Sequence, residues 1–448
     1  MAGQLEREQW GGKLAYILSS VGFSVGLGTF WRFPPLVGEY GGGSFLVPFI
    51  IITIMIGFPM LLLEAAFGRR IKANPVVGIS KIVKSSGIKW TFAGWFPVIT
   101  SILLMSYYIL MTGWMLYYFI LMTSGKILTL EIGELRELNQ LFTADVKLNL
   151  ILYFVVVIIL GTVVSKGIKK GIEKVCKYML PLLLAILLTL FVRTLLLPGS
   201  VNGLKWFFHF DKTLFTWEVL LAALGQSFFS IGIGVSTAIV YGSYLDDEVN
   251  LVKDCGTVVV FILLIAMLIG SIIFMAVFAF GLKPAEGPAL IFIIMPYLFS
   301  KMPMGNLFGS LFFIAIFLAG ILPGIGYLEA VTSAFSEKFS LSRRLGTFYA
   351  LVAISLLGIF SILSFGPLKE FKILEMTIFT FLDYLTGNIL MPVNSILLLL
   401  FLFRKWGLAS LQKEVFKQKG TDLNIGSKSM YVYWFVFLLL LVILYFNF

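Results

Sequence analysis

Eleven long apolar segments, separated by short polar loops, run through the sequence almost from end to end. Each is close to or above the roughly 20 residues that a helix needs to cross a bilayer. The segments lie at residues 14–36, 44–68, 91–124, 148–165, 173–197, 217–244, 254–282, 306–335, 345–366, 376–403 and 430–447. This pattern predicts an all-α integral membrane protein with eleven spans.

Two of these spans are interrupted by residues that a lipid-facing helix should avoid. The first contains Gly22, Gly26 and Gly28, followed by the charge of Arg32, which is costly at depth in a bilayer. The sixth reads GQSFFSIGIGVST at 225–237, again with glycines and hydroxyls at mid-span. Backbone groups in lipid cannot stay unpaired, so broken helices must line a protein-enclosed cavity. Both interruptions therefore indicate a substrate pathway.

The order of the broken helices suggests internal symmetry. Interrupted spans that lie five helices apart are typical of two inverted five-helix repeats, with a binding site at the midplane. We expect the first repeat over 1–197 and the second over 198–404, with an external hairpin at about 284–303. Residues 405–448 should form a cytoplasmic loop and helix eleven.

Composition agrees with a chain that lies almost wholly in the membrane. Of the 448 residues, 59% are hydrophobic and only 13% are charged, whereas soluble domains carry about a quarter. The net charge of +11 reflects Lys and Arg residues that gather in alternate loops, so it does not call for nucleic acid. Their distribution predicts a multi-pass protein with a cytoplasmic N-terminus. We expect it in the cell (plasma) membrane, as the resemblance described below implies.

Several function classes find no support in the sequence. Cys176 and Cys255 lack metal-type spacing, and the lone His209 cannot form a metal cluster. We find no nucleophile–base pair and no nucleotide-binding loop, so an enzyme is not expected, and neither is a cofactor. Broken helices that line an enclosed cavity suit a closed binding site better than an ion channel.

A set of motifs spread along the chain carries a specific resemblance. The motifs are Trp10, GFSVGLGTFWRFPP at 22–35, GGGSFLVPF at 41–49, PMLLLEAAFGR at 59–69, Tyr107-Tyr108 and GQSFFSIGIG at 225–234. Together they resemble the neurotransmitter:sodium symporter family, in its eleven-span prokaryotic form. The resemblance implies the leucine-transporter-type fold, with 5+5 inverted repeats, broken helices 1 and 6, and transport by alternating access.

The same resemblance implies which residues form the substrate site and its gates. The substrate-binding residues would be Phe23, Ser24, Gly26, Leu104, Tyr108, Phe229, Ser230, Gly232, Val235, Pro323 and Tyr327. Tyr108 would bond the substrate carboxylate, and Phe229 would form an aromatic lid. Arg32 with Asp383 would be the extracellular gate. The intracellular gate would consist of Arg7, Trp10, Tyr244 and Glu337.

Taken one at a time, these residues have plainer interpretations. Tyr108 and Phe229 could be core aromatics, Arg32 a snorkelling interfacial arginine, and Asp383 a helix-end acid. The intramembrane acids Glu64 and Glu329 are functional candidates by default, and we favour a structural, hydrogen-bonded role for both. The transporter interpretation rests on the residues jointly.

The ion sites depart from the family pattern. The resemblance leaves Gly22, Ser24, Val25, Thr29, Ser230 and Ala319 as residual sodium ligands. Ile262 stands where the family has an asparagine, and Leu322 and Pro323 stand where it has two hydroxyl ligands. Losing oxygens that replace the hydration shell of sodium costs a few kcal/mol each. We therefore expect coupling that is weak, single-ion or sodium-independent.

A chloride site is depleted in the same way. Phe49 and Ala266 replace family polar residues, and Gln226 and Ser230 remain. Chloride is therefore not expected as a coupling ion.

The expected function is secondary active transport of a neutral, apolar or aromatic amino acid. No charged side chain among the implied pocket residues could pair with an acidic or basic substrate. The partners are then the amino acid and membrane lipid, and the chain could be a monomer or a homodimer. The alternative is a non-transporting amino-acid sensor built on a transporter scaffold.

Overall fold

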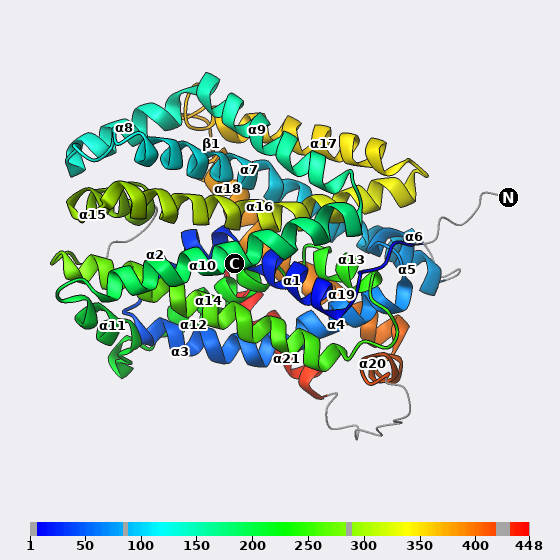
Figure 1. Ribbon diagram of the computed structural model, residues 1–448. Coiled ribbons are helices and arrows are strands. Elements are labelled where there is room, and N and C mark those ends of the chain that lie inside the picture. Colours follow the sequence, from blue (N-terminus) through cyan, green and yellow to red (C-terminus); the bar gives the residue numbers. More distant parts are fainter. Residues whose placement is uncertain (1–6, 84–87, 284–288, 418–430, 448) are drawn as a thin grey trace.

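The structure, a computed structural model, describes residues 7–83, 88–283, 289–417 and 431–447. Its helices run side by side along one direction, with the first described residues at one end of the bundle (Figure 1). Within those ranges the only strands are the two-residue β1 (Lys372–Ile373) and β2 (Met376–Thr377). The predicted all-α membrane fold is confirmed.

A helix lies at each of the eleven predicted spans. The first five spans comprise α1 (Lys13–Ser24), η1 (Gly28–Arg32) and α2 (Phe33–Glu39); α3 (Gly43–Ile52), η2 (Thr53–Gly57) and α4 (Phe58–Ile71); α7 (Trp95–Thr123); α9 (Val146–Val164); and η3 (Ile168–Glu173) with α10 (Lys174–Leu195). The later spans comprise α12 (Trp217–Ile231) and α13 (Thr237–Ser243); α14 (Leu251–Ala279); α16 (Gly305–Lys338); α17 (Arg343–Leu363); α18 (Ile378–Tyr384), η6 (Leu385–Leu390), α19 (Met391–Phe401) and η7 (Leu402–Trp406); and α21 (Tyr431–Asn447).

The loops contain further helices, which the sequence analysis did not predict. They are α5 (Pro75–Val83), α6 (Ile88–Ala93), α8 (Ile132–Ala144), α11 (Ser200–Phe208), η4 (Lys212–Leu214) and α20 (Leu408–Val415). The external hairpin is helical at η5 (Leu290–Ile294) and α15 (Met295–Lys301), while its residues 284–288 lie outside the described ranges. Lys301 donates to Glu131 at 2.8 Å, which raises the pKa of Lys301 and ties α15 to the start of α8.

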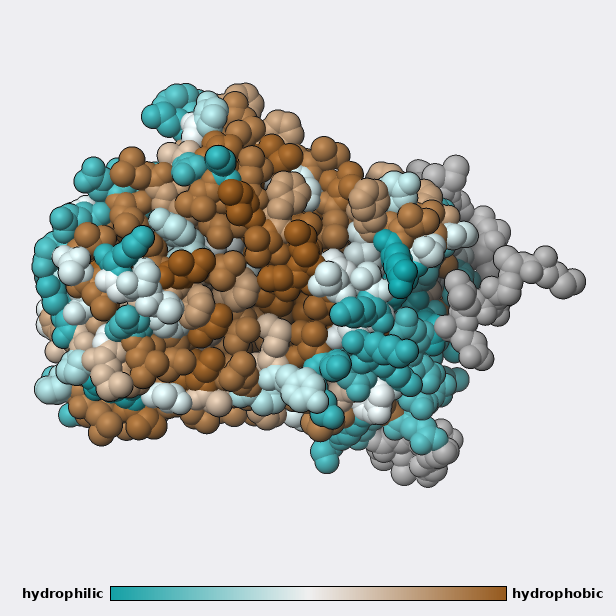
Figure 2. Space-filling model, turned by 45° about the horizontal axis from the view of Figure 1, so that its top comes forward, coloured by the Kyte–Doolittle hydropathy of each residue, from teal (hydrophilic) through white to brown (hydrophobic). Residues whose placement is uncertain are grey.

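The outer surface has the form expected of a membrane protein. An apolar band covers the middle of the molecule, and hydrophilic residues gather at its two ends (Figure 2). Large side chains such as Ile158, Leu188 and Leu356 are more than half exposed. Since exposed apolar area of this extent is unfavourable in water, these side chains face lipid. Within the part of the chain that the structure describes, eight helices are long and apolar enough to span a membrane, or nine when the bent first pair is counted.

The first and sixth spans, which the sequence predicts to be broken, are both interrupted in the structure. Between α1 and η1 the chain turns by 40° at residues 25–27. Between α12 and α13 it passes through Gly232, Gly234 and Ser236, all of which have positive φ. Glycine adopts such φ values at little cost, so the two glycines allow the chain to leave the helix here. Ser24 at the first break donates to the carbonyl of Ile231 at 3.2 Å, which joins the two breaks.

Helices α4 and α13 cross at unusually short distance because glycines lie at the crossing. A Cβ atom on Gly68 would fall 1.9 Å from the carbonyl oxygen of Ile239, and one on Gly242 would fall 2.4 Å from that of Ala65. Small residues allow this approach in membrane helix packing. Helix α13, the second half of the broken sixth span, is thereby held against α4.

We predict that Gly68→Ala destabilises the protein by about 1–3 kcal/mol, because the added methyl group meets backbone that cannot move aside. A lowered thermal unfolding temperature in detergent measures this. Gly133→Ala on α8 is the control, since nothing lies within 4 Å of its Cβ position. Equal melting temperatures for Gly68→Ala and the control would contradict the tight crossing.

Candidate functional site

The two helix breaks lie together in the interior, where aromatic side chains surround them. Phe23, at the end of α1, packs against Tyr327 of α16 with ring centroids 5.0 Å apart, and against Tyr241 at 5.9 Å. The Phe23 ring also lies against Gly232 and Gly326, where any Cβ atom would come within 2.5 Å of it. Phe23 therefore closes the side of the site that leads toward α13.

Tyr108 of α7 forms a wall of the same site. Its hydroxyl accepts a hydrogen bond from the backbone N–H of Leu27 and donates to the carbonyl of Ala319, both at 3.3 Å. Its ring meets that of Tyr327 edge-on at 5.6 Å. The hydroxyl thus bridges the first break and α16, and it points to where the resemblance places a substrate carboxylate.

The other predicted pocket residues border the same breaks or adjoin them along the chain. A Cβ atom on Gly26 would lie 2.6 Å from Pro323 Cγ, so these residues touch. The hydroxyl of Ser230 accepts from Gln226 at 2.8 Å, and the carbonyl of Val235 accepts from Ser101. Leu104 is buried one turn before Tyr108. All eleven predicted substrate-site residues are buried.

Phe229 lies on the opposite side of the site from Phe23. Its ring packs on Gly28, and the guanidinium carbon of Arg32 lies 5.5 Å above the ring centroid. This stacking of a cation on an aromatic face is favourable in a site of low polarity. Phe229 and Arg32 together cover the site on this side, as the resemblance implies.

The predicted ion pair between Arg32 and Asp383 is not present among the described residues. Arg32 instead donates to Asn388 Oδ1 at 2.8 Å. The reason lies in η6, a π-helical segment that follows directly after Asp383. Its i→i+5 bonding puts residue 388 about one turn further along the face that residue 383 occupies, and so brings an amide to Arg32 in place of the acid.

The four residues predicted to form the intracellular gate lie together in the structure. Arg7 forms a salt bridge with Glu337 and donates to Ser243 at 2.9 Å. Its guanidinium also lies 4.5 Å from the centroid of the Tyr244 ring. Trp10 Nε1 donates to the carbonyl of Tyr241 at 3.0 Å. These contacts hold the segment that contains Arg7 and Trp10 against the end of α13.

Further residues complete this network, and the sequence analysis did not predict their role in it. The hydroxyl of Tyr244 donates to Glu329 at 2.5 Å, and the other oxygen of Glu329 pairs with Arg343. The backbone N–H of Asn74 donates to Glu337 at 3.0 Å. Glu329 thus has the hydrogen-bonded role that we favoured. The arginine at 343 had no distinguishing sequence signal beyond its place next to a span.

The residues predicted as residual sodium ligands lie around the first break. The side chain of Leu322 reaches to 3.4 Å from the Cβ position of Gly22. The carbonyl of Ala319 is engaged by Tyr108, and the hydroxyl of Ser24 by Ile231. Thr29 Oγ1 is buried and has no partner among the described atoms. Val25 is buried at the break.

Gln226, the main remnant of a chloride site, has its amide hydrogens engaged within the protein. Its Nε2 donates to the carbonyl of Gly28 at 2.9 Å and to the hydroxyl of Ser230 at 2.8 Å.

These features define a class of protein: a multi-span membrane transporter with broken helices around a central site. The sequence profile of the family described as "Sodium:neurotransmitter symporter family" matches residues 7–131 and 125–447. The chain belongs to the sodium:neurotransmitter symporter family, which is a family of transporters and not of enzymes.

Individual relatives agree with this assignment. An uncharacterized sodium-dependent transporter of Bacillus subtilis, YhdH, is 31% identical over 97% of this chain and 95% of its own length. The crystal structure of MhsT in complex with L-phenylalanine matches with a TM-score of 0.89 at 31% identity, covering 99% of this chain and all of that one. The human sodium-dependent neutral amino acid transporter SLC6A17 is 29% identical over 61% of this chain and 41% of its own.

We predict that Arg7→Ala loosens the cytoplasmic side. Hydrogen bonds to charged groups contribute about 1.5–3 kcal/mol, so their loss should raise the open population roughly ten- to hundredfold. Alkylation of Cys176, which is buried near Gly22, reports the opening.

Arg136→Ala on exposed α8 serves as the control for this measurement. Equal alkylation rates of Cys176 in both variants would show that Arg7 does not hold the cytoplasmic side closed.

Proposed function

We propose that the protein is a secondary active transporter of neutral amino acids with apolar or aromatic side chains. The observation that carries this proposal is the meeting of two helix breaks inside an uncharged aromatic shell formed by Phe23, Tyr108, Phe229 and Tyr327. Backbone groups at the breaks can bind a zwitterion, while the aromatic shell accepts only an uncharged side chain. The L-phenylalanine in complex with MhsT supports the same substrate class.

The carboxylate and the ammonium group of the substrate would each bind at helix ends beside the breaks. The N-terminal ends of η1 and α13 present backbone N–H groups and a positive dipole end, which favour a carboxylate. The Tyr108 hydroxyl is close to the first of these ends. Carbonyls at the C-terminal ends of α1 and α12 would accept from the ammonium group. Phe23, Ser24, Gly26, Ser230, Gly232 and Val235 then contact the substrate through backbone or side chain.

Alternating access would use the two groups of gate residues. The arginine network around Arg7 and Glu337 holds the cytoplasmic side closed, whereas Arg32 lies over Phe229 without pairing to Asp383. Formation of the Arg32–Asp383 pair would then be a later step, after a substrate is bound. A sensor would need only one opening, so gates at both ends favour transport. We place the N-terminus in the cytoplasm and assign residues 1–197 and 198–404 to two inverted repeats.

Sodium coupling would be weaker than in a two-sodium symporter. The relatives are named sodium-dependent transporters, which supports sodium as the ion. In this chain, however, Leu322 reaches toward Gly22, where the resemblance places a sodium ion, and Pro323 packs on Gly26. The carbonyl of Ala319 already accepts from Tyr108, and the Ser24 hydroxyl is oriented by its donation to Ile231. These contacts favour one weak sodium site, a different ion or none.

We predict that a neutral amino acid, with phenylalanine or leucine among the strongest, raises the melting temperature of the purified protein, because a ligand that binds only the native state stabilises it. The full set of twenty amino acids is tested in sodium and in sodium-free buffer of matched ionic strength. Stabilisation should be nearly equal in both buffers. Stabilisation that requires sodium would contradict weak coupling, and no stabilisation by any amino acid would contradict the substrate class.

We also predict that Leu322→Thr combined with Pro323→Ser introduces sodium dependence. The two hydroxyls would restore oxygens next to the carbonyls of Gly22, Val25 and Ala319. Amino acid binding by the double variant should strengthen at least tenfold when sodium replaces choline, whereas binding by the parent should change little. Leu322→Ala with Pro323→Ala controls for volume. A sodium response equal in both double variants would contradict the assignment of this site.

A further inference from the structure

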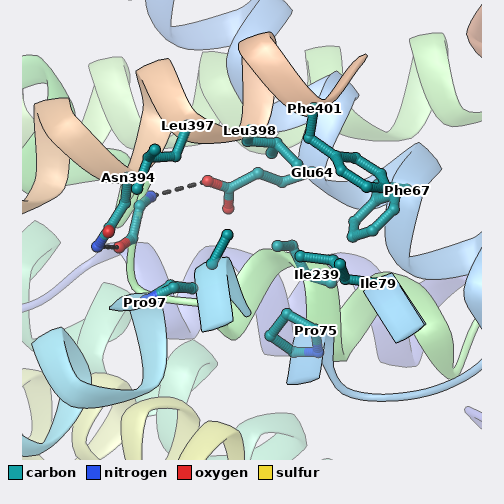
Figure 3. Close-up of a pocket in the computed structure, with 12 residues that line it drawn as sticks. Glu64, Phe67, Pro75, Ile79, Pro97, Ile239, Asn394, Leu397, Leu398 and Phe401 are labelled. Atoms are coloured by element: carbon teal, nitrogen blue, oxygen red, sulfur yellow. Dashed lines mark hydrogen bonds between the residues drawn. The ribbon is translucent and has the colours of Figure 1, made fainter. Parts of the chain in front are cut away.

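A small cavity lies behind the break of the sixth span, separate from the aromatic site. It is bounded by α4, α5, α6, α7, α13 and α19 (Figure 3). Its walls are mainly apolar, and it offers about 20 Å³ to the centre of a water-sized sphere, which is room for about one water molecule. Three polar groups face it: the Glu64 carboxyl, the Asn394 amide and the peptide of Gly234.

Glu64 and Asn394 hold the Gly234 residue from two sides. Glu64 Oε1 accepts from the N–H of Gly234 at 2.8 Å, and Asn394 Nδ2 donates to its carbonyl at 2.7 Å. Gly234 has φ +80°, and a Cβ atom there would lie 2.5 Å from the carbonyl oxygen of Met391. The geometry of the break therefore depends directly on these two side chains from α4 and α19.

Each of these side chains has one oxygen that lacks a partner. Glu64 Oε2 and Asn394 Oδ1 are both buried, and neither has a hydrogen-bond donor among the described atoms. The residues themselves are 1% and 4% exposed. An ionised carboxylate and an amide oxygen are both acceptors, so together they need a donor that the surrounding protein does not supply. A protonated Glu64 no longer needs a donor for Oε2, because that oxygen then carries a hydrogen of its own.

Charged groups elsewhere do not neutralise Glu64. Among the described lining residues, it is the only titratable side chain. The charges on α4 and on the helices packed against it are engaged elsewhere or face solvent: Arg69 pairs with Glu414 of α20, Asp254 of α14 pairs with Lys13, and Lys81 of α5 is exposed. The titratable group of α13 is Tyr241, which packs on Trp10 and Phe23. An unpaired ion in this cavity would be costly, so the neutral acid is favoured.

We propose that Glu64 is a proton-binding site whose occupancy is coupled to the break of the sixth span. With the proton on Oε2, the carboxylic acid is neutral and Oε1 keeps its bond to Gly234. Loss of the proton to water leaves a carboxylate that needs hydration. Water can reach it only if the cavity walls separate, and that movement releases the clamp on Gly234. Coupling of this proton to amino acid binding rests on the function proposed above.

Infrared difference spectroscopy tests the site without any amino acid. The protein at neutral pH should show the carbonyl band of a protonated carboxylic acid, which Glu64→Gln removes and Glu137→Gln on exposed α8 retains. Asn394→Leu should shift the band by removing a polar group from the cavity that holds the acid, which preserves the test if Glu64→Gln folds poorly. No band lost in Glu64→Gln, or a band that responds to sodium and not to pH, would overturn the proposal.

Amino acid binding as a function of pH tests the coupling. Because the closed state holds the proton more tightly than the open state, affinity should be highest at low pH. It should fall up to tenfold per pH unit as the open state loses its proton. Glu64→Gln should bind with the low-pH affinity at every pH, and an unchanged pH slope in this variant would overturn the coupling. Absence of amino acid binding in all variants would refute the proposed function, while the infrared band still decides the proton site.

Discussion

The structure depends on one constraint: the backbone groups released where two membrane helices break must find partners inside the protein. Lipid offers none. Tyr108 forms a hydrogen bond with the backbone at the first break, and Glu64 and Asn394 do so at the second. Ser24 links the two breaks to each other. Any backbone group that these side chains leave available is a polar site inside an apolar bundle. A site of this kind suits a zwitterion that carries an apolar side chain, because backbone dipoles bind its charges and aromatic rings enclose the remainder.

The same constraint explains how the site can have two entrances and open one at a time. The breaks are held by few contacts on the α2 side, where Arg32 covers Phe229 and bonds Asn388. On the α13 side they are held by many, including the salt bridges of Arg7 with Glu337 and of Arg343 with Glu329. The contacts that close one side therefore differ in kind from those on the other. A change at the breaks can then shift the balance between the two sides without unfolding any span.

Much of this architecture could be predicted from the sequence. The lengths of the apolar segments predicted every span. The glycines at 232 and 234 predicted a break, because tolerance of a positive φ is a local property of the residue type. The gate residues around Arg7 came from resemblance and lie together as expected. The pairing of Arg32 could not be predicted, since it depends on the π-helical segment after Asp383, which periodicity does not reveal. The loop helices were missed because they are short and are stabilised by packing against the spans. The clamp on Gly234 required the spatial juxtaposition of α4 and α19, which no local pattern encodes.

Our proposal for the coupling ion rests on where oxygen atoms are free. Around Gly22 and Ala319 they are few or already bonded, whereas Glu64 and Asn394 present unpaired oxygens at the second break. The most direct test is concentrative uptake of a neutral amino acid into proteoliposomes under an imposed gradient. We predict accumulation driven by an inward proton gradient in the absence of sodium. Uptake with a steep dependence on sodium, at a stoichiometry near two and with no response to the proton gradient, would contradict the account.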